Sequence, residues 1–180
     1  MTPQDAPGTH DPKKDPAPAA AHAKWWQTSE AIFGTALVLA LILELTYPLS
    51  LTQWLARPVL LTLGGLAVCA GLILIILTRR QMSAAAQPTA PGIPTTKLVT
   101  TGVFAWSRNP IYLGLAALFI SMALTVNSVW LLGTLALALI ATHYVMIRPE
   151  EAYLTKLFGD DYRLYTQTVG RWWGHKNHRR

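Results

Sequence analysis

The chain has 180 residues, of which 52% are hydrophobic and only 13% are charged, whereas a typical soluble domain carries about 25% charged residues. This composition argues against a soluble protein, and the length excludes two large domains. The net charge of +6 would favour nucleic-acid binding in a soluble chain, but these basic residues flank apolar segments, so membrane orientation explains them better and we expect no nucleic-acid partner.

Residues 1–24 contain five prolines among aspartate, lysine and alanine residues. Their apolar surface is too small to offset the entropy lost on ordering, so we expect a disordered N-terminal tail. The tail lacks the short apolar core of a secretory signal and is expected to stay in the mature protein. The remainder is expected to form a membrane-embedded domain over 25–173, followed by a basic C-terminal tail over 174–180.

Four segments approach the length of about 20 apolar residues that crosses a bilayer. They cover roughly 28–47, 59–77, 111–126 and 129–147. The second carries no charge, and Gly64, Gly65 and Gly71 offer small surfaces for close helix approach. Only two residues separate the last two segments, which predicts an antiparallel hairpin, although hydropathy leaves open whether that hairpin crosses fully or is partly re-entrant. The sequence thus predicts an all-α integral membrane bundle of about four transmembrane helices, with short C-terminal cytoplasmic helices.

The basic residues give this bundle an orientation. Fourteen of the 15 lysines and arginines lie before the first segment, between the second and third, or after the fourth. Only Arg57 falls on the other side. By the positive-inside rule, both termini and the 78–110 loop face the cytoplasm. We therefore expect a multi-pass protein of the inner, cytoplasmic membrane.

The first candidate site stretch covers residues 95–114. Pro110 suits the first turn of a helix, and the side chain of Ser107 or Asn109 is expected to cap it. Free backbone N–H groups at that helix start, together with Arg108, would suit an anion such as a carboxylate or phosphate. The plainer alternative is a capped helix start with Arg108 reaching out to lipid headgroups.

The second candidate stretch covers residues 142–173. His143 and Tyr144 lie inside the last apolar segment, and Arg148, Glu150 and Glu151 follow where the helix should leave the membrane. Polar groups at membrane depth usually face the bundle interior or a watery cavity. Arg148 and Glu151 are three residues apart and can pair on a continuing helix; an exposed ion pair at the helix exit is the plainer reading.

An amphipathic pattern follows, with a break at Gly159-Asp160 between two short helices. Its apolar positions are Leu154, Leu157, Phe158, Tyr162, Tyr165 and Val169. The sequence contains no dinucleotide fingerprint, Walker motif, HExxH pair or serine elbow. Since the five histidines are scattered and Cys69 is the lone cysteine, we expect no metal site.

Two motifs in order resemble a known family. The stretch LVTTGVFAWSRNPIYLG, followed after a helical hairpin by RPEEAYLTKLFGDDYRLYTQTV, resembles the isoprenylcysteine carboxyl methyltransferase and phospholipid methyltransferase family of integral membrane enzymes. The family's RHPxYxG motif is matched by Arg108, Pro110, Tyr112 and Gly114, with Asn109 in place of histidine.

The second motif matches at its paired glutamates, Glu150 and Glu151, and at an FGxxYxxY run that begins at Phe158. Gly170 stands where the family frequently has proline.

The resemblance implies S-adenosylmethionine as methyl donor, bound on the cytoplasmic side between the membrane helices and the C-terminal helices. It implies cofactor binding by Arg108, Asn109, Pro110, Tyr112, Leu113, Gly114, His143, Tyr144, Glu150 and Glu151. It implies catalytic roles for His143, Arg148 and Glu151. A carboxylate acceptor needs no base, whereas an ammonium acceptor must first lose a proton, for which Glu151 or His143 is the nearest candidate.

The expected function is transfer of a methyl group from S-adenosylmethionine to a hydrophobic or lipid-linked carboxylate, amine or thiol, with membrane lipids as the surroundings. One alternative is an NADPH-dependent membrane reductase related to the C-terminal region of steroid reductases. Another is a non-enzymatic membrane adaptor. The acceptor and the oligomeric state are left open by the sequence.

Overall fold

The computed structural model describes residues 28–86 and 95–175. Their elements are α1 (Ser29–Thr46), η1 (Leu51–Gln53), α2 (Arg57–Ala84), η2 (Gly102–Ala105), α3 (Pro110–Val126), α4 (Val129–Thr142), η3 (His143–Ile147) and α5 (Arg148–Thr168). Because these residues form helices and no named strand, the all-α prediction is confirmed. The expected tail over 1–24 and the end of the basic C-terminal tail lie outside the described residues.

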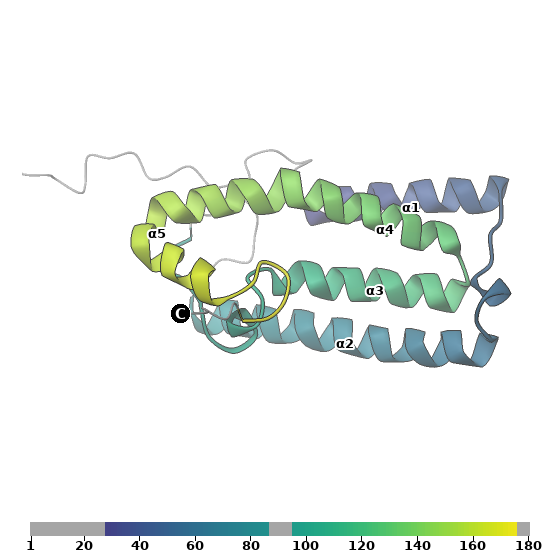
Figure 1. Cartoon of the computed structure of the whole chain (residues 1–180), viewed down its shortest axis with the longest axis horizontal. Helices are drawn as coiled ribbons and strands as arrows, with labels where there is room; N and C mark the ends of the chain where they lie inside the picture. The colour runs from purple at the N-terminus through teal and green to yellow at the C-terminus, as the bar shows by residue number, and fades with distance from the viewer. Residues whose placement is uncertain (1–27, 87–94, 176–180) are drawn as a thin grey trace, which may run out of the picture.

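The helices α1 to α4 lie side by side as an antiparallel bundle (Figure 1). The α1–α2 connection and the α3–α4 turn meet at one end, whereas α5 and the segment before α3 gather at the other (Figure 1). By length and composition, α1, α2 and the continuous Val129–Thr168 helix can each cross a membrane. The remaining apolar helix, α3, has 17 residues, or about 26 Å of helix. The chain is therefore a multi-pass membrane protein by its helices.

Two helices extend beyond their predicted apolar segments. The second apolar segment ends at Leu77, but α2 continues to Ala84, because Arg79 to Ala84 contain no glycine or proline to stop it. The fourth segment forms α4, which continues directly into the π-helical turn η3 and then into α5, with no non-helical residue between these elements. Pro149 lies in the first turn of α5, directly after the π-helical turn.

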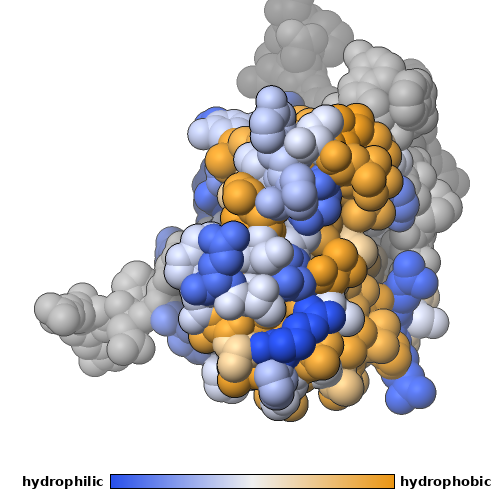
Figure 2. Space-filling view, turned by 90° about the vertical axis from the view of Figure 1, so that its right-hand side faces the viewer, coloured by the Kyte–Doolittle hydropathy of each residue, from blue (hydrophilic) through white to orange (hydrophobic). Residues whose placement is uncertain are grey.

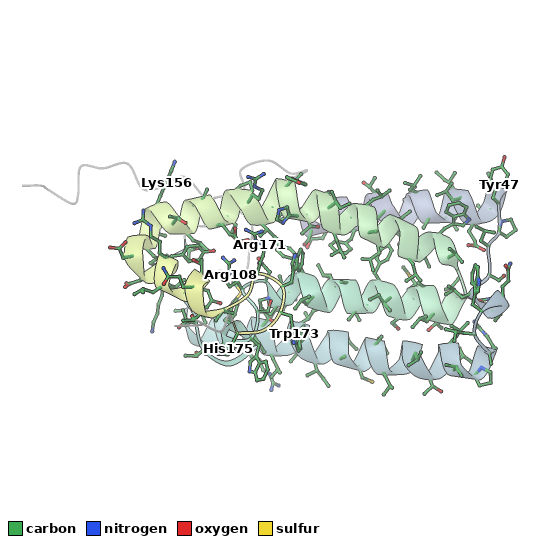
Figure 3. The ribbon with its side chains drawn as sticks, viewed as in Figure 1. Tyr47, Arg108, Lys156, Arg171, Trp173 and His175 are labelled. Atoms are coloured by element: carbon green, nitrogen blue, oxygen red, sulfur yellow. The ribbon has the colours of Figure 1, made fainter. Side chains whose placement is uncertain are left out.

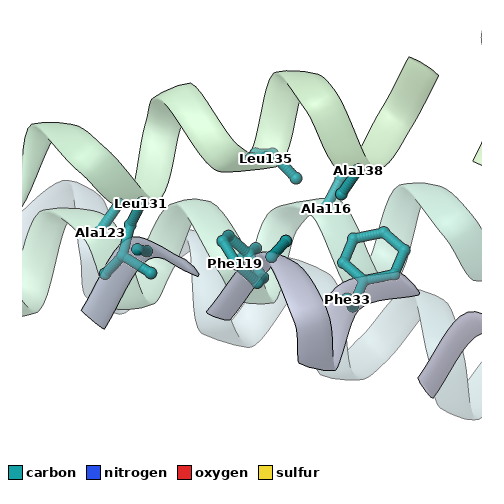
Figure 4. Close-up of a cluster of buried hydrophobic side chains, with 9 residues drawn as sticks. Phe33, Ala116, Phe119, Ala123, Leu131, Leu135 and Ala138 are labelled. Carbon is teal, nitrogen blue, oxygen red and sulfur yellow. The ribbon is translucent and has the colours of Figure 1, made fainter. Parts of the chain in front are cut away.

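One apolar core joins α1, α3 and α4 (Figure 4). Phe33 of α1 and Phe119 of α3 are in contact, with ring centroids 5.9 Å apart. The other buried members are Ala36, Ala40, Ala116, Ala123, Leu131, Leu135 and Ala138. Alanines at these positions let the three helices approach closely, as small residues do in membrane bundles.

Glycines bring α2 and α3 together. A Cβ placed on Gly71 would lie 2.9 Å from the carbonyl oxygen of Gly114, and one on Gly114 would lie 2.6 Å from the Ile75 side chain. Gly64 likewise faces α3, whereas a Cβ on Gly65 would meet nothing within 4 Å. The predicted close approach is therefore confirmed for Gly64 and Gly71 and wrong for Gly65.

Polar contacts close the end of the bundle opposite α5. Asn127 adopts a left-handed conformation (φ 68°) between α3 and α4, and its side chain donates to Thr52. Ser128 donates to Glu44, and the Trp130 indole donates to the Tyr47 carbonyl. Figure 2 looks onto this end and shows hydrophilic side chains gathered among hydrophobic ones. This mixture is typical of a surface at the membrane–water interface.

Candidate functional site

A cavity lies at the α5 end of the bundle, where the end of α2, the segment before α3 and α5 come together. Its empty space, counted together with its open mouth, is about 630 Å³. The residues that line it are Met82, Thr95, Lys97, Leu98, Val99, Phe104, Arg108, Asn109, Glu150, Glu151, Leu154, Tyr162 and Tyr165. Both candidate stretches of the sequence thus meet at one cavity.

The segment before α3 is attached to α2 and α5 by side chains. Gln81 of α2 accepts a hydrogen bond from the backbone N–H of Val103 at 3.0 Å. The Tyr153 hydroxyl of α5 accepts one from the N–H of Thr95 at 3.3 Å. These bonds fix the wall of the cavity that precedes Arg108.

The start of α3 differs from the prediction in its cap. Pro110 occupies the first turn as expected, but neither Ser107 nor Asn109 caps the helix through its side chain. The Asn109 amide instead donates to the carbonyl of Arg171 at 3.0 Å, and Ser107 Oγ accepts from the N–H of Asn109. The cap prediction is wrong because Asn109 is bonded to a segment far along the chain.

Two arginines hold Glu151. Arg108 Nη1 lies 2.9 Å from Glu151 Oε1, while Arg171 donates from Nε and Nη2 to the two carboxylate oxygens at 2.8 and 2.6 Å. Figure 3 shows Arg108 and Arg171 near each other between α5 and the start of α3. The side chain of Arg108 is only 7% exposed. It therefore points into the protein, and the alternative in which it reaches to headgroups is wrong.

Arg148 does not pair with Glu151. Its guanidinium lies over the ring of Tyr144, 5.6 Å from the centroid, and both residues are exposed. The predicted Arg148–Glu151 pair is therefore wrong, because Glu151 faces inward to Arg108 and Arg171 while Arg148 stays on the outer side of the helix. The π-helical turn before Arg148 adds to this separation, since it changes the helical register.

The two neighbouring glutamates have opposite electrostatics. Burial and the charge of Glu151 raise the pKa of Glu150 to about 7. Desolvation also acts to raise the pKa of Glu151, but the Arg171 hydrogen bond and the charges of Arg108, Arg171 and His143 outweigh it and hold that pKa below its usual value. Glu151 is thus a fixed anion, whereas Glu150 can carry or release a proton near neutral pH.

Glu150 is the glutamate with capacity to meet a ligand. It lines the cavity, and within 28–86 and 95–175 no hydrogen bond or ion pair engages its carboxylate. The cavity also holds an unsatisfied donor, because the buried Nε of Arg108 has no hydrogen-bond partner among the described residues. Buried polar atoms are normally paired, so a hydrogen-bond acceptor of a ligand, such as a carboxylate oxygen, is the natural partner for this N–H.

Aromatic side chains form the wall beside these charges. Two of these aromatic residues follow the predicted break in α5. The break is confirmed at Gly159, whose φ of 54° and ψ of −121° are not helical. Beyond it, Tyr162 and Tyr165 are buried and line the cavity with Phe104. Tyr165 donates to the carbonyl of Phe104 at 2.6 Å. Desolvation raises the pKa of both tyrosine hydroxyls, so they stay protonated.

The later residues of the first motif lie in the bundle rather than at the cavity. Tyr112 is buried, with its hydroxyl 4.0 Å from Met146 Sδ, and Gly114 faces Gly71 and Ile75 of α2. Leu113 is half-buried and does not line the cavity. Gly114 thus provides a close approach between helices, and the part of the motif at the cavity is Arg108 and Asn109, with Pro110 behind them.

His143 and Tyr144 also lie outside the cavity lining. Their rings contact each other edge to face, 4.9 Å apart, and Tyr144 is 58% exposed. His143 is half-buried and close enough for its charge to lower the pKa of Glu151. The structure therefore joins Arg108, Asn109, Glu150 and Glu151 and leaves Tyr144 and Arg148 on the outer surface.

The sequence did not identify Arg171 or Lys97 as site residues, and it favoured a packing role for Tyr162 and Tyr165. Arg171 follows the buried Val169 and stands among basic and aromatic residues, so its spacing carries no signal that it returns to Glu151 from 20 positions away. The tyrosines do pack, and they line the cavity as well.

Comparison with known proteins agrees with this arrangement. The model of the phospholipid methyltransferase family matches residues 59–161. An uncharacterized protein of Haemophilus influenzae is 38% identical over 63 residues, which cover 34% of this chain and 98% of that protein. No solved structure matches the chain. Because the family model covers more than half of the sequence, including the first motif and the paired glutamates of the second, the chain belongs to the phospholipid methyltransferase family.

Proposed function

We propose that the protein is an S-adenosylmethionine-dependent methyltransferase that methylates a hydrophobic or lipid-linked acceptor, and that residues 25–173 form its functional unit. The observation that carries the proposal is the cavity that joins the two family motifs. It places a buried, partly unsatisfied arginine, a titratable glutamate and three aromatic rings around one space. We further propose that the cavity faces the cytoplasm, with both chain termini on that side.

The residues present fit this cofactor. S-adenosylmethionine carries a carboxylate, an ammonium, a sulfonium, ribose hydroxyls and a flat base. The unpartnered Nε of Arg108 and the ammonium of Lys97 suit the carboxylate. Glu150 suits the ammonium or the hydroxyls, and the rings of Phe104, Tyr162 and Tyr165 suit either the base or a cation.

When bound, the cofactor supplies a methyl group on a positively charged sulfur. The protein has to hold the donor and the acceptor in line and keep water out. Leu98, Val99 and Leu154 give the cavity apolar walls for this purpose. Glu151, whose charge is already balanced by two arginines, holds Arg108 in place without adding a free negative charge to the site.

An ammonium acceptor would require a base, and the geometry favours Glu150 for that role over Glu151 or His143. The pKa of Glu150 is raised to about 7, which suits proton transfer near neutral pH. Its carboxylate can then take the proton from the acceptor nitrogen before that nitrogen is methylated. A carboxylate acceptor would need no such step, and Glu150 would then serve in binding.

The test is methyl transfer in membranes that contain the protein. Membranes are incubated with S-adenosylmethionine labelled in the methyl group, and the label extracted into organic solvent is counted. We expect incorporation with the natural chain and a loss with Glu150→Gln, which is about 100-fold for an ammonium acceptor that needs the base. The control Asp161→Asn, a change to an exposed acid of the same helix, should have little effect. Equal incorporation with and without the protein would overturn the proposal.

A further inference from the structure

We propose that Arg171, which lies beyond the matched family region, is a positioning residue that fixes Glu151 so that Glu150 alone of the glutamate pair meets the ligand. The inference rests on the proposed function and extends the site to a segment that we call the C-terminal hook, residues 169–175. It is carried by the geometry of the Arg171 side chain and by the backbone bonds of the hook.

The side chain of Arg171 makes a two-pronged contact. Its Nε and Nη2 donate to the two oxygens of Glu151 at 2.8 and 2.6 Å. A guanidinium fork matches a carboxylate in direction as well as charge, so it fixes the carboxylate's plane. With Arg108 2.9 Å from Oε1 on another side, both oxygens of Glu151 are held by cations, although the residue lines the cavity.

The backbone of the hook is bonded to the first motif. Arg108 donates its N–H to the carbonyl of Gly170 at 3.2 Å, and Gly174 donates its N–H to the carbonyl of Trp106 at 2.9 Å. The Asn109 amide donates to the carbonyl of Arg171 at 3.0 Å. Trp106, Arg108 and Asn109 are thus all joined to the hook, which places Arg171 opposite Glu151.

The hook closes on itself at a glycine. The N–H of Gly170 donates to the carbonyl of Gly174 at 2.7 Å, and Val169 and His175 form an isolated bridge. A Cβ on Gly170 would lie 2.4 Å from the carbonyl oxygen of Trp173. A proline at this position would lack the N–H and would clash, so glycine suits the closed form of the hook.

The surroundings of Glu151 show what loss of Arg171 would do. The groups that face it are Arg108 from the first motif, Arg171 from the hook, His143 from η3, Glu150 beside it on α5 and the Tyr162 hydroxyl beyond the break. Without Arg171, one cation and a hydrogen bond pair are lost, and Oε2 has no partner. The pKa of Glu151 would then rise, and in its ionised form the freed carboxylate would compete with Glu150 for a cationic ligand.

The experiment compares Arg171→Gln with the conservative Arg171→Lys in detergent-purified protein. Arg163→Gln is the matched control, because Arg163 is 67% exposed and pairs only with Asp160 among the described residues. Hydrogen exchange is measured at 106–109 and 170–174, and binding of S-adenosylhomocysteine is measured across pH. We expect Arg171→Gln to speed exchange in both segments, weaken binding about 10-fold and move the acid limb of the binding profile to higher pH.

The remaining variants separate positioning from folding. Arg171→Lys should restore part of the affinity, because it returns the charge without the fork, and Arg163→Gln should match the natural chain. Adding Arg171→Gln to Glu151→Gln should weaken binding no further, since the two residues act through one contact. An unchanged pH profile, or full additivity, would overturn the inference. Absence of binding in the natural chain would overturn the proposed function, whereas the exchange comparison would still decide whether Arg171 fixes the motif.

Discussion

Two adjacent glutamates acquire different properties because their side chains leave the helix in different directions. Glu151 reaches Arg108 and Arg171, and its pKa is lowered, whereas Glu150 lines the cavity, and burial beside the charge of Glu151 raises its pKa to about 7. The sequence identifies both as site residues, but it assigns the role of candidate base to Glu151 and only cofactor binding to Glu150. The contacts of Glu151 with Arg108 and Arg171 distinguish the two glutamates, and no local pattern encodes the return of Arg171 from 20 positions away.

The pKa of Glu150 predicts a stability difference that depends on pH. Because the pKa rises from 4.5 to about 7 on folding, the folded protein binds more protons than the unfolded chain between these values. Stability therefore falls as pH rises from about 4.5 to about 7. Glu150→Gln removes the cost in folding stability of ionising this buried carboxyl, because glutamine does not ionise.

We expect Glu150→Gln to unfold at a higher temperature than the natural chain at pH 8 and at a similar temperature at pH 4. Thermal unfolding in detergent, followed by tryptophan fluorescence, measures this. Asp161→Asn is the control and should show no such pH-dependent difference. A Glu150→Gln variant that is less stable at pH 8 would contradict the assigned burial of this carboxylate.

At the scale of elements, the apolar segments and the α5 break could be predicted because each depends on local sequence. Hydropathy marks the spans, and Gly159 marks the break. The cap of α3 could not be predicted, because Asn109 bonds to the hook. The outward position of Tyr144 and Arg148 depends on the π-helical turn, for which the sequence carries no marker.

The contact between α2 and α3 predicts that alanine substitution changes the free energy of unfolding at Gly114 but not at Gly65. Gly114→Ala would place a methyl group 2.6 Å from Ile75 and 3.1 Å from the carbonyl of Gly71, so we expect a loss of about 1–3 kcal/mol. Gly65→Ala meets nothing within 4 Å and should be neutral or slightly stabilising. Unfolding in a denaturant series compares the two, and equal effects would contradict the close approach of these helices.

The break in α5 predicts that replacing Gly159 lowers the stability of the protein. Its φ of 54° and ψ of −121° are open to glycine but strained for alanine, so Gly159→Ala should lose about 1–3 kcal/mol. Because Tyr162 and Tyr165 lie beyond the break, binding of S-adenosylhomocysteine should weaken too. Gly133→Ala, in an uninterrupted helix with open space around it, is the control. Unchanged unfolding and binding in Gly159→Ala would show that α5 does not need the break.

At the scale of the molecule, the cavity, α5 and the hook all lie at one end of the bundle (Figure 1). The charge distribution predicts that this end is cytoplasmic. In a Cys69→Ser background, a cysteine at Thr52 should react with an impermeant thiol reagent added to intact cells, and a cysteine at Lys156 should react only after the membrane is opened. The reverse pattern would place the cavity on the outer side.

The central claim is that the cavity between α2, the segment before α3 and α5 binds S-adenosylmethionine. Calorimetric titration of the purified protein with S-adenosylhomocysteine, with NADPH at matched concentration, tests it most directly. The account predicts saturable binding of S-adenosylhomocysteine alone, lost in Glu150→Gln and kept in Asp161→Asn. Binding of NADPH, or of neither compound, would contradict it.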